Sequence, residues 1–165
     1  MNYKSATIAF ILIAFCNLTF AQSEIPDLNR KVVNYVKSVV GQQVDRGECW
    51  DLANQALTQS GAKFDRSTKT SIYDFGQPVN PKKDQIFPGD IVQFDDVELE
   101  YKRGDVIYKE QMGHHTAIVV KVYEPGAFQL AHQNTSFSGK KVGVSDFTLA
   151  HVKKGQIKFF RPEEP

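Results

Sequence analysis

Two stretches in the first third of the chain place apolar residues at helical spacing. Between Pro26 and Val40, apolar positions recur every three or four residues, with lysine and arginine on the opposite face. Gly41 is a suitable stop for this helix. A second pattern, from Glu48 to Ser60, carries an apolar stripe and is followed by Gly61. The sequence therefore predicts two amphipathic helices.

The rest of the chain reads mainly as strands. Residues 63–85 are irregular, and "QPVNPKKD" predicts a loop. "FPGD" predicts a turn before the short strand "IVQF", and residues 95–112 alternate around a glycine, as a hairpin does. Further strands are predicted at "HTAIVVKVY", "FQLAHQN" and "GQIKFFRP". Helices followed by antiparallel strands predict an α+β fold, with N-terminal helices packed on an antiparallel sheet.

The first residues form a pattern of their own. One lysine, Lys4, precedes an apolar run from Ala6 to Phe20, and small residues suited to cleavage follow up to Ala21. This is typical of a secretory signal peptide cleaved before Gln22. The alternative is a retained membrane anchor, for which the run is short. We expect a signal peptide at 1–21, a single domain at 22–165, and a secreted or periplasmic protein that does not contact the membrane after cleavage.

Net charge and histidine spacing argue against two classes of partner, nucleic acids and metal ions. The 165 residues carry a formal net charge of +1. A general nucleic-acid binder needs a basic excess, so we expect no nucleic-acid partner. The histidines lack the spacing of a helical zinc motif, and we expect neither a metal nor a cofactor.

Removal of the signal would leave Cys49 as the single cysteine. An unpaired cysteine in an oxidising compartment is an intermolecular bridge, a free reactive thiol, or a small apolar core residue. Cys49 opens the second predicted helix, where unpaired N–H groups lower a thiol pKa.

Downstream polar residues complete a candidate catalytic set. His115 begins a strand, and "HQN" at residues 132–134 lies on the next one. A tight turn between antiparallel strands brings these positions together, and alternation puts His132 and Asn134 on one face. A histidine that takes the thiol proton, oriented by a third polar group, is the arrangement of a cysteine hydrolase.

The segments "GECWDLANQAL", "FPGDIVQF", "GHHTAIVVKV" and "LAHQN" resemble the CHAP and NlpC-type branch of papain-like cysteine hydrolases. "GECW", "PGDI" and "HHTAIV" also resemble a divergent cysteine-proteinase-fold domain of fungal cortical-actin proteins. The resemblance covers residues 40–160 and is weakest at 95–112. Position 132 is a histidine in this chain. CHAP domains usually have glutamate at the corresponding position, whereas NlpC-type relatives use a residue similar to this histidine.

The resemblance implies a papain-like fold and a role for each site residue. Cys49 would be the nucleophile, His115 the base, and His132 or Asn134 the orienting group. Apart from the resemblance, we expect Trp50, as core or groove wall, and His114 to line the substrate site, with an exchange of roles between His114 and His115 as the alternative. The implied activity is cleavage of amide bonds by a secreted enzyme, with peptidoglycan peptides as substrate. The alternative is a catalytically silent module that binds a cell-wall or peptide ligand. The oligomeric state is not predicted.

Overall fold

The computed structural model describes residues 24–165, and the predicted signal peptide lies outside them. Two α-helices come first in this part of the chain, α1 (Asp27–Val39) and α2 (Cys49–Ser60). Each lies within the limits that the apolar pattern predicts. Gly61 ends α2 in the left-handed conformation, φ 79°, which glycine adopts without strain.

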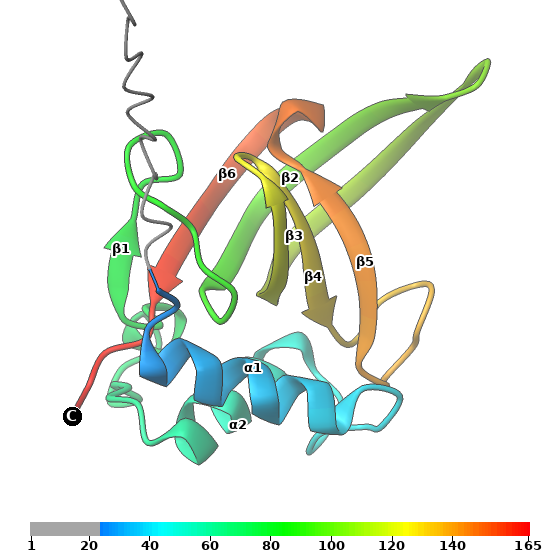
Figure 1. The fold of residues 1–165 in the computed structure, drawn as a ribbon. Helices are drawn as coiled ribbons and strands as arrows, with labels where there is room; N and C mark the ends of the chain where they lie inside the picture. The colour runs from blue at the N-terminus through cyan, green and yellow to red at the C-terminus, as the bar shows by residue number, and fades with distance from the viewer. Residues whose placement is uncertain (1–23) are drawn as a thin grey trace, which may run out of the picture.

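Six strands follow and form one sheet (Figure 1). They are β1 (Gln77–Val79), β2 (Ile91–Arg103), β3 (Val106–Glu124), β4 (Ala127–His132), β5 (Gly143–Thr148) and β6 (Val152–Arg161). A short 3-10 turn, η1 (Ser71–Tyr73), lies between α2 and β1, and a second one, η2 (Leu149–His151), lies between β5 and β6. The order across the sheet is β1-β6-β2-β3-β4-β5, and every neighbouring pair is antiparallel. The α+β prediction, with helices packed on an antiparallel sheet, is confirmed.

Two strands were not predicted. β1 lies inside the segment expected to be a loop, where Val79 is the one buried residue of its three. β5 has a single fully buried side chain, Phe147, so its apolar signal is weak. The pieces predicted separately around residues 91–122 are two continuous strands, because β2 and β3 pair from Ile91–Ile118 out to Arg103–Val106.

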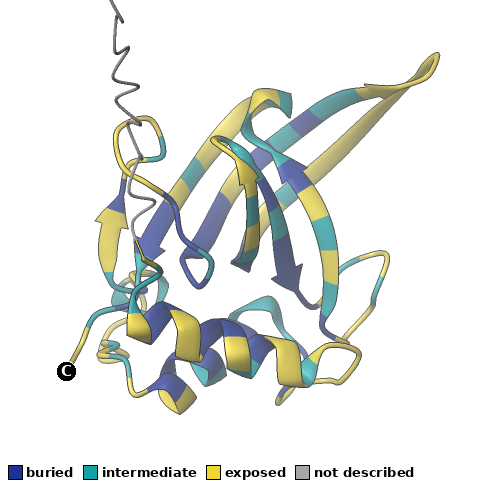
Figure 2. Ribbon diagram, viewed as in Figure 1, coloured by how far each residue is buried: buried dark blue, intermediate teal, exposed yellow. Residues whose placement is uncertain are grey.

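The core has two parts on opposite sides of the sheet, and the helices cover one of them (Figure 2). Alternation along the strands sends Ile91 and Ile118 toward the helices, and Val92 and Val119 to the other side. The helix side is closed by residues of both helices, among them Val32, Val36, Leu52 and Leu57. The other side is filled by aliphatic residues and by four phenylalanines: Phe94, Phe128, Phe147 and Phe159.

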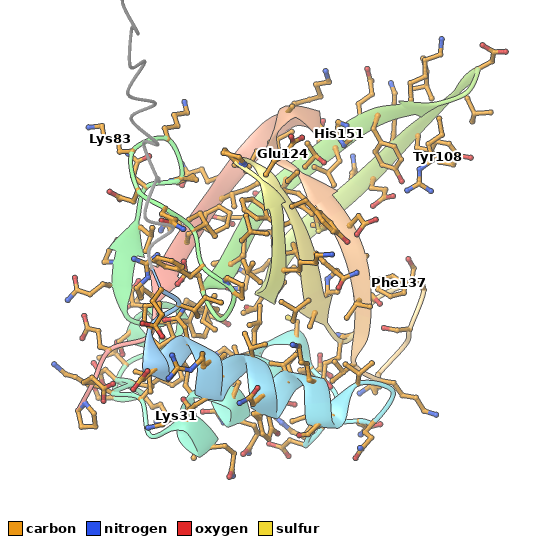
Figure 3. All side chains as sticks on the ribbon, viewed as in Figure 1. Lys31, Lys83, Tyr108, Glu124, Phe137 and His151 are labelled. Carbon is orange, nitrogen blue, oxygen red and sulfur yellow. The ribbon has the colours of Figure 1, made fainter. Side chains whose placement is uncertain are left out.

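The outer part of the β2–β3 hairpin projects from the body as an arm (Figure 1). We use "arm" for residues 100–109, which lie beyond the pairing of β2 with β6 at Leu99. Tyr101 and Tyr108 stack within it, with ring centroids 5.3 Å apart. Tyr108 points from the arm in Figure 3. Within residues 24–165 no helix is long and apolar enough to span a bilayer.

Candidate active site

The first turn of α2 is fixed by a buried carboxylate. Asp51 is inaccessible to solvent, and its carboxylate accepts hydrogen bonds from the backbone N–H groups of Arg46 and Glu48, both at 3.1 Å. The Arg46 guanidinium donates to the same carboxylate at 2.6 Å. These bonds satisfy backbone donors that a helix start leaves unpaired. They hold Cys49 as the first residue of the helix.

The Cys49 thiol lies at the edge of β3. It interacts with the backbone N–H of Thr116, which follows His115 in the chain. Val119 directs its N–H and C=O toward Asp90 and Gly89, on the β2 side of β3. Backbone groups alternate along a strand, so the Thr116 N–H points to the opposite edge, where β4 ends at His132. The start of α2 therefore occupies the edge of β3 just past the end of β4.

The chain after β4 is tied to the same helix start. The buried Gln133 amide donates to the carbonyl oxygens of Val44 (3.0 Å) and Glu48 (2.7 Å) and accepts from the Val44 N–H. Asn134 donates to the Glu48 carboxylate at 2.7 Å, and Lys140 does so at 3.2 Å. These bonds bring positions 49 and 132 to one place in the fold.

His132 lies beside His115. Nε2 of His115 and Nδ1 of His132 are 3.0 Å apart, within hydrogen-bond distance. Phe94 and Phe137 pack against the pair, with ring centroids 6.1 Å from His115 and 5.3 Å from His132. Phe137, labelled in Figure 3, belongs to the loop between β4 and β5. Nδ1 of His115 makes no hydrogen bond within residues 24–165. The ring is therefore held through Nε2, by its bond to His132.

Asn134 has a different position from the one predicted. The strand ends at His132, and Asn134 follows in the left-handed conformation, φ 60°, with its amide on Glu48. It therefore does not continue the alternation that would put it on the face of His132. His132 is the residue of the "HQN" segment that contacts His115.

Burial keeps both imidazoles neutral. Loss of solvation, with a smaller contribution from the nearby His114, lowers the pKa of His115 from 6.5 to about 4. Burial and the neighbouring His115 lower the pKa of His132 to about 3. A neutral His115 can accept a proton at Nδ1 when its own N–H is on Nε2.

The thiol also favours its neutral form, contrary to the expected lowering of its pKa. Burial raises the pKa of Cys49 and outweighs the backbone N–H groups of Thr116, Trp50 and Cys49 itself, which lower it. The carboxylate of Glu48 adds to the increase. No hydrogen bond joins Cys49 to His114 or His115 in the described part of the chain. The resting pair is therefore a thiol and a neutral imidazole.

The two residues expected to line the substrate site lie on the helix side of the sheet. His114 is exposed, packs edge-on against Tyr73 at 4.2 Å, and lies 3.3 Å from the Gln93 amide. Trp50 is half-buried and donates its indole N–H to the Ile72 carbonyl at 2.7 Å. Alternation along β3 directs His114 and His115 to opposite sides of the strand.

Ser145 completes the arrangement and was absent from the predicted site. Its hydroxyl oxygen lies 2.9 Å from Nε2 of His132, on the strand β5 that the sequence analysis missed. The alternating segment "GVSDFT" was the available signal. Within residues 24–165 no three His, Cys, Asp or Glu residues are placed to hold a metal ion. A separate groove of about 820 Å³, between α1, residues 81–88 and the β3–β4 turn, contains none of the predicted site residues.

Comparisons with known proteins agree with the fold. The model of the family described as "AIM3/BBC1 Cysteine proteinase-fold domain" matches residues 26–164. Two crystal structures of Ly7917, one of them "with the hydrolyzing product of MDP", superpose with TM-scores of 0.49 and 0.51 at 18% identity. They cover 80% and 81% of this chain, which spans 62% of the Ly7917 chain. No curated protein matches.

Proposed function

Because the chain belongs to the AIM3/BBC1 cysteine-proteinase-fold family, we propose that it is a cysteine hydrolase that cleaves amide bonds, with Cys49 as nucleophile. The observation that supports this best is the interaction of a helix-first thiol with the backbone N–H of Thr116, the residue that follows His115, together with the bond between His115 and His132. This supplies a nucleophile, a base and an orienting group from three separate elements.

The proposed reaction begins with a neutral thiol. Nδ1 of His115 takes the Cys49 proton as the sulfur attacks the amide carbonyl. The N–H groups of Cys49 and Trp50, which lie in the unpaired first turn of α2, bind the oxyanion that develops. His115 then gives its proton to the leaving amine, and water hydrolyses the acyl-enzyme with His115 again as the base. His132 orients His115 throughout.

We propose peptidoglycan peptides as the substrate class. The CHAP and NlpC-type resemblance supports this choice, and so does Ly7917, whose structure holds the hydrolysis product of MDP. His114 and Trp50 would contact the substrate from the helix side of the sheet.

The test is a digest of purified peptidoglycan, read by mass spectrometry. We expect wild-type protein to release peptide fragments, and Cys49→Ala and His115→Ala to release none. His114→Ala separates the two adjacent histidines, since it removes a proposed substrate contact on the other side of β3 and keeps the base: we expect slower release and not its loss. Equal turnover by Cys49→Ala would contradict the proposal. Loss with His114→Ala and not with His115→Ala would exchange their roles.

A silent binding module is the second candidate. The raised pKa of Cys49 and the lack of a hydrogen bond from the thiol to a histidine favour it. In that case wild type and Cys49→Ala would sediment equally with peptidoglycan, and neither would release fragments.

We propose further that the protein is exported and cleaved before Gln22. The evidence is the sequence pattern of residues 1–21. N-terminal sequencing of the protein recovered outside the cytoplasm tests this, and an intact Met1 there would contradict it.

A further inference from the structure

The hydrogen bonds of the histidine pair continue to a third strand. His115 on β3 is bonded to Nδ1 of His132 on β4, and Nε2 of His132 lies 2.9 Å from the Ser145 hydroxyl on β5. Both ring nitrogens of His132 are therefore used. His132 is 7% exposed and covered by Phe137, so little water can reach it to replace either partner.

The direction of these bonds decides which nitrogen of His115 is a base. A neutral imidazole has one N–H and one lone pair. If Ser145 accepts from Nε2–H of His132, then Nδ1 of His132 must accept from Nε2–H of His115. This leaves the lone pair of His115 on Nδ1. If Ser145 donates instead, every proton moves to the other nitrogen, and His115 has an N–H at Nδ1 and cannot accept there.

We propose that Ser145 is a positioning residue for the hydrolase proposed above: its hydroxyl oxygen accepts the Nε2–H of His132 and so keeps the lone pair of His115 on Nδ1. The serine does not contact the reacting atoms. It acts through two imidazoles in series: its bond to His132 fixes the tautomer of His132, and the bond from His132 fixes the tautomer of His115.

Within residues 24–165, the Ser145 hydroxyl forms its side-chain hydrogen bond with His132 alone. Along β5 the next residue, Asp146, points to the other face and accepts from the Tyr123 hydroxyl at 2.9 Å. Asp146→Asn is thus a matched control on the same strand. Ser145→Thr keeps a hydroxyl at the position, and Ser145→Ala removes it.

The experiment is ¹⁵N NMR of protein labelled at histidine, which separates protonated from unprotonated ring nitrogens. We expect wild type to show His132 protonated at Nε2, and His115 protonated at Nε2 with Nδ1 bare. Ser145→Ala should shift both residues toward a mixture of tautomers, whereas Ser145→Thr and Asp146→Asn should keep the wild-type signals. Protonated Nδ1 in wild type, or identical signals in Ser145→Ala, would overturn the proposal.

Activity is a separate readout. Peptide release by Ser145→Ala should fall about tenfold, the factor that a hydrogen bond of usual strength supports, and return in Ser145→Thr. If wild-type protein has the expected tautomers but releases no peptide, the proposed function fails and the role of Ser145 in setting the tautomers stands. If it releases peptide with the opposite tautomers, the hydrolase function stands, but the role of Ser145 and the use of Nδ1 of His115 as the base both fail.

Discussion

His115 and His132 share a site from which water is largely excluded, and this sets how the protein responds to acid. Unfolding returns each imidazole to an ordinary pKa near 6.5, whereas the folded values are about 4 and about 3. Below pH 6.5 the unfolded chain therefore binds protons that the folded chain does not. Stability is fully present above that pH and falls as pH decreases toward 4, by at most about 1.4 kcal/mol per pH unit for each histidine.

We therefore predict that the free energy of unfolding decreases steeply between pH 6.5 and 4. Urea denaturation at several pH values measures this decrease. In the double variant His115→Gln, His132→Gln the slope over this interval should become shallower, because the carboxyl groups common to both proteins are unchanged. Equal slopes in the two proteins would contradict the assigned pKa values.

Cys49 titrates in the opposite range. Because burial raises the pKa of its thiol, we predict slow alkylation by iodoacetamide at pH 6–7 and a steady increase as pH rises above neutrality. Glu48→Gln removes an adjacent negative charge and should shift the rate profile toward lower pH. The rate is followed by mass spectrometry. A thiol that already reacts at its maximum rate at pH 6 would contradict this assignment.

Some features of the candidate site could be predicted from the sequence alone, and others could not. The contact between His115 and His132 could be predicted, because both residues lie on neighbouring antiparallel strands. The position of Cys49 at the start of α2 could be predicted from the apolar stripe of that helix. The raised thiol pKa could not, since it depends on how deeply the start of α2 is buried. The bond between Asn134 and Glu48 was equally out of reach, because it depends on where β4 ends.

At the scale of elements, α2 depends on one side chain. Asp51 combines a capping role with an ion pair to Arg46, whose side chain is 68% exposed. We predict that Asp51→Ala destabilises the protein by about 3 kcal/mol, because the backbone N–H groups of Arg46 and Glu48 lose a fully buried acceptor. Arg46→Ala should cost under about 1 kcal/mol, since the partner it removes is mostly in water. Urea denaturation compares the two. Similar losses would mean that the ion pair, and not the cap, holds the helix.

Elements differed in how well the sequence predicted them. Both helices have long apolar stripes and glycine stops, and both were predicted within a residue or two of their limits. β1 has three residues, too few for a periodic signal, and β5 alternates over six residues with one buried side chain, so its signal is weak. β1 is placed by its pairing with β6, which lies far away along the chain, and β5 by its pairing with β4 across the loop 133–142.

At the scale of the whole molecule, the arm is separate from the site. Its Tyr101 stacks on His151 of η2, and its remaining contacts lie largely within the hairpin. We predict that replacing residues 100–109 with Asn-Gly, a two-residue turn between the paired Leu99 and Glu110, changes stability by less than about 1 kcal/mol. Thermal denaturation and the Cys49 alkylation rate measure the outcome. Slower or faster alkylation would show that the arm shapes the site.

The bond from Gln133 to Glu48 at the start of α2 spans 85 residues, so the surroundings of the thiol change while the chain is being synthesised. A nascent chain that has emerged only through its helices lacks the strands that bury Cys49 and both residues of the imidazole pair. Until the last third of the polypeptide is made, the sulfur is an ordinary cysteine open to solvent and to oxidants. The surroundings of Cys49 are therefore complete only when β4 docks, so that a product of translation truncated before β4 carries an exposed thiol.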